Sequence, residues 1–454
     1  MIKLFTATTT PPPPPPSATV TQQTDGRTTS QAEVCLARRE HQSFQVALRP
    51  RSTMNAVRLI AKASVPAVVV TVALVIQVNV SVAINAANRT GLFPDALPAQ
   101  PAKGATLPAG ITTAWWVTVT SALSGNFSIS LELEEPHTDS TQLGTVAITV
   151  LDFAIPPPNS SSFMSDAGID FSPFFLWAKT PVAQRPAVIK GIYAQLAQYR
   201  INRLVSCDGV VTTGVSAAPS LLRGGIDISR TGLATAGMDE MIALVLRHGF
   251  TAFALPNIKG CGPVLRKPHV ALPTDTWMIN GTAYPIFKKN IAAAAPAAQL
   301  SAPFVAAFKS VYGAMYAHLV SKGWAQHARA IFLDEPSRGG FTTSAVNAVN
   351  ALWSEVGLRV MQTEYETALR NVTSWNIKAD SYTPALVAAQ RTKGGNESEV
   401  LVYSNAQAII DLPAIRSRSL LWMIQRSNAN GTGFQGWGSE TGYCEWHELK
   451  YGIR

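Results

Sequence analysis

The chain is poor in charged residues and carries no concentrated basic segment. Charged residues make up 14% of its 454 residues, whereas average soluble proteins have about a quarter. The hydrophobic share is 47%, which excludes a disordered chain as a whole. The net charge of +9 is spread without a Lys/Arg run longer than two residues. That spread argues against a nucleic-acid-binding stripe, and we expect no nucleic-acid partner.

Cysteine and histidine are too few and too scattered for the common metal sites. None of the four cysteines forms a CxxC pair, which excludes zinc ribbons and redox motifs and leaves either buried free thiols or at most two disulfides. The seven histidines include no i, i+4 pair and no HExxH. A phosphate-binding glycine loop and a GxSxG elbow are also missing. We therefore expect neither a metal nor an organic cofactor.

The sequence has no convincing transmembrane segment. Residues 64–84 are uncharged and rich in valine, but residues 77–82 alternate with strand period, and Pro66 interrupts the stretch. Because β-branched residues dominate it, we expect strands there. At the amino terminus, residues 1–5 precede a polyproline run and provide no apolar core of a signal peptide.

Asparagine nevertheless points to export. Eight of the 18 asparagines lie in N-x-S/T sequons, which is typical of a glycosylated chain. We therefore expect a secreted or lumenal protein, although a composition rich in Ser and Thr could also produce sequons. The sequon asparagines are Asn79, Asn88, Asn126, Asn159, Asn280, Asn371, Asn396 and Asn430.

Turn-forming residues and the periodicity of apolar residues divide the chain into four parts. Residues 1–30 are a Pro/Thr-rich tail that we expect to be disordered. Residues 31–155 contain short alternating runs between Gly, Pro and Asn residues, which predict a β-sandwich. A Pro/Ser-rich linker covers residues 156–162, and residues 163–454 form the last part.

The last part alternates strands with helices, which favours a (β/α)8 TIM-like barrel. A doubly wound sheet remains an alternative. The predicted strands are 167–171, 203–206, 251–255, 330–333, 359–363, 377–382, 399–403 and 433–437. The predicted helices include 187–199, 238–247, 303–320, 344–356 and 413–425.

One apolar strand of this barrel runs directly into two acidic residues, Asp334 and Glu335. In such barrels, catalytic residues lie where the strands end. Mutual repulsion and partial burial raise the pKa of one of two adjacent carboxyls, as a proton donor near neutral pH requires. Pro336 ends the strand and lets both side chains reach one pocket. The alternative is a structural pair tied to Arg338 or to backbone amides.

Aromatic and amide residues at later strand ends could line a carbohydrate pocket. Each of them could equally be part of the core or the rim. The candidates for substrate binding are Tyr365, Tyr382, Tyr403, Asn405 and Trp437.

An ordered set of motifs resembles glycoside hydrolase family 123 and related proteins of unassigned function. The set covers about residues 33–440 and includes Leu333-Asp334-Glu335-Pro336, which resembles the family's catalytic Asp-Glu segment. Asp380-Ser381-Tyr382-Thr383-Pro384 takes the place of an Asp-x-Trp-x-Pro element, with Tyr382 where Trp is usual. The other members are residues 33–40 and 43–48, 93–97, 116–119, 413–418 with Trp422, and 433–438.

The resemblance implies a retaining β-N-acetylgalactosaminidase that uses substrate assistance. In that mechanism the 2-acetamido oxygen of the sugar attacks the anomeric carbon, so no carboxylate nucleophile is needed. By position, Glu335 would be the general acid/base, and Asp334 would orient and polarise the acetamido group. The implied substrate is a glycan or glycolipid with β-linked N-acetylgalactosamine. A glycan-binding protein without turnover and a structural surface protein remain alternatives.

Overall fold

The structure, a computed structural model, divides into two compact units between Pro156 and Pro157. Each unit has its own hydrophobic core, and each is treated separately below. The described residues are 2–6, 31–80, 90–94, 97–136, 140–169, 180–204, 228–229, 232–233, 236–255, 276–279, 282–288, 300–331, 342–363, 368–395, 398–403 and 415–437.

The first unit is a sandwich of two sheets, as the alternating runs predict. One sheet has the order β1 (Ile2–Thr6), β3 (Gln42–Leu48), β9 (Thr113–Ser121), β5 (Val68–Leu74), with every pair antiparallel. The other has the order β2 (Gln31–Arg38), β11 (Thr141–Ala154), β10 (Gly125–Glu134), β4 (Met54–Ala63), β8 (Ala105–Leu107). A short hairpin of β6 (Gln77–Val80) and β7 (Gly91–Pro94) accompanies them.

Strand period places the apolar side chains of both sheets in one shared core. Phe44 and Val46 of β3 are buried together with Trp115 of β9, and Ile129 of β10 packs in the same cluster. The strands predicted within residues 64–84 are confirmed by β5 and β6. Among the described residues no helix is long and apolar enough to cross a membrane.

Two expectations about this unit need correction. The disordered tail expected over residues 1–30 is wrong for Ile2–Thr6, because this short apolar segment pairs with β3 as strand β1. Residues 7–30 lie outside the described part of the chain. Cys35 is free and exposed, so it is not one of the buried thiols considered above. The other three cysteines also lie outside the described residues.

The second unit is a closed parallel barrel, as predicted. Eight strands follow in the order β19-β16-β13-β12-β23-β22-β21-β20, and a parallel bridge between Ala330 and Val360 joins the two ends. The amide of Ala330 donates to Arg359 O, and the amide of Met361 donates to Ala330 O, both at 2.8 Å. The strands are β12 (Met164–Ile169), β13 (Arg203–Leu204), β16 (Ala252–Ala254), β19 (Ala328–Arg329), β20 (Met361–Gln362), β21 (Ser374–Lys378), β22 (Glu399–Tyr403) and β23 (Gly431–Trp437).

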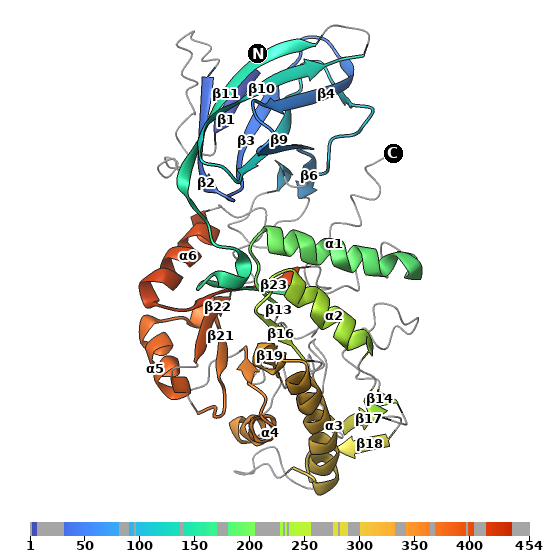
Figure 1. Cartoon of the computed structure of the whole chain (residues 1–454), viewed down its shortest axis with the longest axis vertical. Helices are drawn as coiled ribbons and strands as arrows, with labels where there is room; N and C mark the ends of the chain where they lie inside the picture. The colour runs from blue at the N-terminus through green and yellow to red at the C-terminus, as the bar shows by residue number, and fades with distance from the viewer. Residues whose placement is uncertain are drawn as a thin grey trace. The chain divides into compact units, whose positions relative to one another are not determined.

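Within the described ranges of this unit, six α-helices lie around the outside of the strands (Figure 1). Phe304 and Phe308 on one helix and Trp353 on the next are completely buried in the layer between helices and strands. Ser301, Thr342 and Thr383 cap three of these helices with their side chains. The helices are α1 (Arg185–Gln198), α2 (Ala236–Arg247), α3 (Ala302–Ser321), α4 (Thr343–Glu355), α5 (Pro384–Gly394) and α6 (Ile415–Ser427). Two hairpins also belong to this unit, β14 (Ile228–Ser229) with β15 (Gly232–Leu233) and β17 (Thr276–Ile279) with β18 (Thr282–Pro285).

The barrel strands β19 and β21 lie earlier in the sequence than predicted. β19 covers Ala328–Arg329 in place of residues 330–333, with Ala330 forming a further bridge. A strand is predicted over residues 377–382, whereas β21 covers Ser374–Lys378 and a 3-10 turn over Ala379–Ser381 comes next. The reason is that the inward positions of β21 are polar, and only Trp375 and Ile377 face the helices. Tyr382 therefore follows the turn and does not end a strand.

Four of the sequon asparagines in the described residues are exposed: Asn79, Asn126, Asn159 and Asn371. The side chain of a fifth, Asn430, is only partly buried, and its Oδ1 accepts the amide of Val400 at 2.9 Å. The exposed positions are sterically open to a glycan.

The close packing of β23 against β12 predicts that a side chain at Gly431 would destabilise the barrel. A Cβ on Gly431 would lie 1.7 Å from the carbonyl oxygen of Met164 on the neighbouring strand, and backbone cannot move aside cheaply. We expect Gly431→Ala to lower the free energy of unfolding by about 3 kcal/mol, measured by urea denaturation.

Gly191→Ala is the matched control, because this exposed position in α1 has nothing within 4 Å of an added Cβ. The control should gain up to about 1 kcal/mol from the higher helix propensity of alanine. Equal stabilities of Gly431→Ala and the wild type would contradict the strand packing described here.

Candidate functional site

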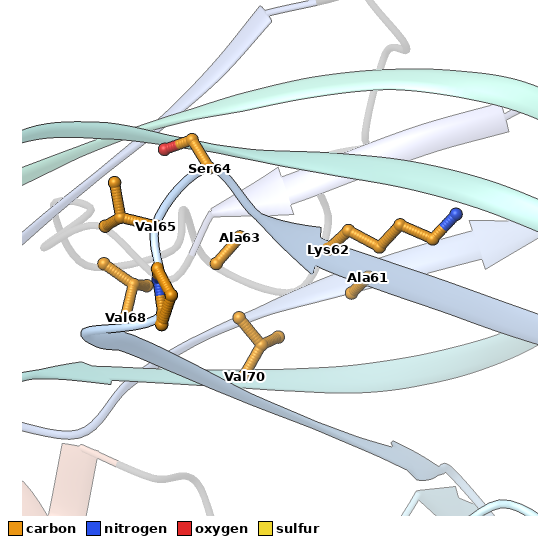
Figure 2. A pocket seen from close by; sticks show the side chains of 8 residues that line it. Ala61, Lys62, Ala63, Ser64, Val65, Val68 and Val70 are labelled. Atoms are coloured by element: carbon orange, nitrogen blue, oxygen red, sulfur yellow. The ribbon is translucent and has the colours of Figure 1, made fainter.

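The sandwich has a pocket that is lined by few side chains able to take part in a reaction. It lies at the turn between β4 and β5, where mostly small apolar side chains surround it (Figure 2). Its one charged lining group, the Lys62 ammonium, pairs with Glu132 at 2.9 Å. The lining residues are Ala61, Lys62, Ala63, Ser64, Val65, Pro66, Val68 and Val70. With no carboxyl, thiol or imidazole among them, this pocket is not a candidate active site.

The barrel interior has an apolar side formed by β16, β19 and β20. Ala252, Ala254, Ile331 and Met361 are buried in a cluster of their own, separate from the core beneath the helices. Their chain neighbours, such as Phe253, belong to that outer core, so these four side chains point inward. Ile331 directly precedes the segment that contains Asp334 and Glu335.

The opposite side of the interior is polar and lies on β21, β22 and β23. Asn376 points inward, because its neighbours Trp375 and Ile377 pack beneath the helices. An added Cβ on Gly433 would lie 2.8 Å from Asn376 Nδ2 and 3.2 Å from the Cβ of Tyr403. Since β22 separates β21 from β23 in the sheet, these residues meet inside the barrel. Tyr403 is the last residue of β22, so this polar side reaches the carboxyl end, where barrel enzymes bind substrates.

An ionic cluster closes the other end of the barrel, where the strands begin. Glu399, the first residue of β22, accepts from Arg203 at 2.8 Å and from Arg329 at 3.1 Å and 2.6 Å. Arg359 adds a weaker ion pair at 3.6 Å. The Arg203, Arg329 and Glu399 side chains are 2%, 4% and 9% exposed, so the cluster excludes water. Arg203 also donates to Ser374 Oγ at 3.3 Å. The Glu399 cluster therefore ties together β13, β19, β21 and β22.

The guanidinium groups keep Glu399 ionised. Burial raises the pKa of the Glu399 carboxyl, but the charge of Arg203 and the charge and hydrogen bonds of Arg329 together outweigh burial. The pKa of Glu399 therefore lies well below its ordinary value of 4.5. Burial lowers the pKa of Arg329 to about 10, against the hydrogen bond and charge of Glu399, so Arg329 remains a cation at neutral pH. In a barrel of this kind, the amino-terminal end serves stability.

The structure describes only some of the predicted site residues. Asp334, Glu335, Tyr365 and Asn405 lie outside the described residues. For Trp437 the backbone is described, as the last residue of β23 paired with Ile169 of β12. Tyr403 is buried at the carboxyl end of β22, next to Asn376 and Gly433.

Tyr382 lies in a different layer from Tyr403. Its hydroxyl donates to the carbonyl of Met423 on α6 at 2.7 Å. Its ring packs against Val402, Leu420 and Ile424, between β22 and the helix. This placement explains why an aromatic residue is needed there, because the ring joins α6 to the sheet.

Sequence reasoning missed both Asn376 and the Glu399 cluster. A signal for the cluster is present, since Arg203, Arg329, Arg359 and Glu399 each stand at or next to the start of an apolar strand segment. Charged residues repeated at that position of several barrel strands indicate an ionic layer at the amino-terminal end. For Asn376 the signal is weaker, a single amide between Trp375 and Ile377.

Comparison with solved structures gives a similarity that spans both units. The match is a family 123 glycoside hydrolase from Clostridium perfringens, studied for glycolipid glycan hydrolysis, with a TM-score of 0.63 and 10% identity over 90% of this chain and 74% of that one. The chain has the fold of a family 123 glycoside hydrolase. At this identity, the likeness establishes the fold alone.

Other comparisons add nothing to the site. The match to domains 4 and 5 of the S-layer protein SbsC has a TM-score of 0.15 and 14% identity over 26% of this chain and 47% of that one. No family model matches the sequence, and neither does any curated protein. Within the described ranges, no three His, Cys, Asp or Glu side chains are grouped so that they could hold a metal ion.

Removing the charge of Glu399 should destabilise the barrel strongly. Glu399→Gln would leave Arg203 and Arg329 buried with no carboxylate, which costs about 3–5 kcal/mol of unfolding free energy, measured by urea denaturation. Glu355→Gln is the matched control, because Glu355 pairs with Lys309 at 2.7 Å while both side chains are about half exposed. The control should lose no more than about 1 kcal/mol. Equal losses in the two variants would contradict the structural role of the Glu399 cluster.

The lowered pKa of Glu399 also predicts a pH dependence. A carboxyl whose folded-state pKa is depressed stabilises the fold above its unfolded pKa, here 4.5, and this contribution disappears as the pH falls toward the folded value. The stability difference between the wild type and Glu399→Gln should therefore be constant above about pH 5.5 and should shrink steadily below about pH 4.5. Denaturation curves from about pH 7 to pH 3 test this. A difference that grew on acidification would contradict it.

Proposed function

We propose that the chain is a retaining glycoside hydrolase that cleaves β-linked N-acetylhexosamine, specifically N-acetylgalactosamine, from glycans or glycolipids by substrate assistance. The observation that carries the proposal is a family 123 fold over 90% of the chain, together with an Asp-Glu pair that follows a barrel strand. Asp334 and Glu335 come three and four residues after Ile331, which lies inside the barrel beyond the end of β19.

The barrel interior supports a sugar site at the carboxyl end. The inward residues Ala252, Ala254 and Gly433 are small, and Asn376 and Tyr403 supply polar groups on one side. A carbohydrate site needs this combination of space, hydrogen-bonding groups and aromatic surface. The Glu399 cluster closes the opposite end, and its ionic groups are already paired with one another.

The two carboxyls would divide the work. Glu335 would protonate the glycosidic oxygen as the bond to the leaving group breaks, and would later take a proton from the attacking water. Asp334 would accept the acetamido N–H and polarise that group, so that its carbonyl oxygen attacks the anomeric carbon. Because the nucleophile belongs to the substrate, the two carboxyls need not face each other across the sugar ring.

Hydrolysis of p-nitrophenyl β-N-acetylgalactosaminide and its β-N-acetylglucosaminide isomer tests the proposal. We expect the wild type to release p-nitrophenol, with a preference for the galactosaminide. Glu335→Gln should lower kcat/KM by about 10²–10⁴-fold, because a general acid/base contributes that much. The release of p-nitrophenol is followed by its absorbance.

Glu355→Gln serves again as the control, since this exposed helix residue should leave kcat/KM unchanged. Full activity of Glu335→Gln would refute the role of Glu335. If the wild type cleaved neither aryl glycoside nor a natural oligosaccharide ending in N-acetylgalactosamine, the hydrolase proposal would be wrong.

A further inference from the structure

The interior of the barrel contains a buried side-chain amide, that of Asn376, whose oxygen has no hydrogen-bond partner among the described residues. Asn376 is the middle residue of β21 and is 9% exposed. Its Oδ1 is buried and accepts no hydrogen bond from any residue that the structure describes. Such orphaned groups are rare in native cores, because each costs about 1–3 kcal/mol when it is removed from water without a partner.

One other buried asparagine, Asn202, shows the contrast. Asn202 is 1% exposed, and its Oδ1 accepts the amide of Ser165 at 2.8 Å, while its Nδ2 donates to Phe163 O at 2.9 Å. Asn202 thus holds the strand ends of β12 and β13 together. Asn376 performs no comparable task in the described part of the barrel.

The surroundings of Asn376 point toward a ligand. The amide lies against Gly433, where a Cβ would come within 2.9 Å of its Oδ1, so only glycine leaves this space to the amide. Tyr403 borders the same space from the last position of β22. Ser374, one inward position earlier on β21, is instead bonded to Arg203. The amide therefore stands between the ionic amino-terminal end and the carboxyl end of the barrel.

We propose that Asn376 is a sugar-binding residue whose Oδ1 accepts a hydrogen bond from a ring hydroxyl of the N-acetylhexosamine. This inference rests on the proposed function, and it assigns a further residue to the same site. The uncharged amide suits a neutral hydroxyl donor, because a carboxylate at this depth would need a cation beside it. Binding of the sugar satisfies the buried acceptor, so the stability lost in the free protein is recovered as affinity.

A nearly isosteric substitution separates this role from a structural one. Asn376→Leu keeps the branched shape but removes the acceptor. We expect the melting temperature of the free protein to stay the same or rise, since an unsatisfied polar group disappears from the core. The affinity for N-acetylgalactosamine, measured by calorimetry, should fall about 10-fold or more. Asn202→Leu is the matched control and should lower the melting temperature clearly.

Asn376→Ser provides the second variant in case leucine disturbs packing, because serine is smaller, uncharged and retains an acceptor oxygen. It should bind N-acetylgalactosamine more tightly than Asn376→Leu does. A panel of 3-, 4- and 6-deoxy forms of methyl β-N-acetylgalactosaminide identifies the hydroxyl. One of these sugars should bind the wild type more weakly than the parent sugar, and this discrimination should vanish in Asn376→Leu.

The possible failures are distinct. If the wild type binds and cleaves the sugar while Asn376→Leu binds it equally well, Asn376 has no part in recognition although the hydrolase proposal stands. A marked fall in melting temperature for both Asn376 variants would mean that the amide serves the fold, which also overturns the inference. If the wild type neither binds nor cleaves any N-acetylhexosamine, the proposed function fails, and the role of Asn376 fails with it.

Discussion

The barrel depends on one buried carboxylate held by arginines from several strands. Both carboxylate oxygens of Glu399 accept hydrogen bonds, which come from Arg203 on β13 and from Arg329 on β19. Because these strands are far apart in sequence, no local preference can bring them together. A charge that is buried without its partners is very costly, so the cluster strongly favours the one strand arrangement that pairs all of its members.

The Glu399 cluster also makes the two ends of the barrel chemically different. Its charges are neutralised within the protein at the end where the strands begin, and water is excluded there. At the other end, small side chains and a few polar groups remain, among them Asn376 and Tyr403. The amino-terminal end of a (β/α)8 barrel usually serves stability, and this chain achieves that with ions in place of the more common branched apolar layers.

Much of this architecture could be predicted from the sequence, because period and punctuation are local signals. Residues 400–403 are a continuous apolar run directly after Glu399, and β22 has the predicted bounds, Glu399–Tyr403. The sandwich followed from alternating segments such as Gln42–Leu48. β21 begins earlier than predicted for a physical reason. Its inward residues Ser374 and Asn376 are polar, so the segment contains no apolar run by which a strand could be recognised. Helix α5 was not among the helices specified, although Thr383 and Pro384 form a good start for it.

The candidate site could be proposed from the sequence only where residue type and position coincide. Asp334 and Glu335 are conspicuous because acidic residues directly follow a predicted apolar strand, and Tyr403 because an aromatic residue ends β22. Tyr382 has the same residue type, but its hydroxyl bonds to the carbonyl of Met423 in the helical layer, and a sequence cannot specify which layer a side chain joins. Asn376 was missed because one unsatisfied acceptor becomes visible only when all of its neighbours are known.

The most direct measurement is a crystal structure of the chain with bound N-acetylgalactosamine. We expect the sugar at the carboxyl ends of β19 to β23, with a hydroxyl oxygen within about 3.2 Å of Asn376 Oδ1 and the acetamido group beside Asp334 and Glu335. A sugar bound outside the barrel interior, or an interior that stays empty at saturating sugar while the carboxyls point away from it, would contradict the location of the site.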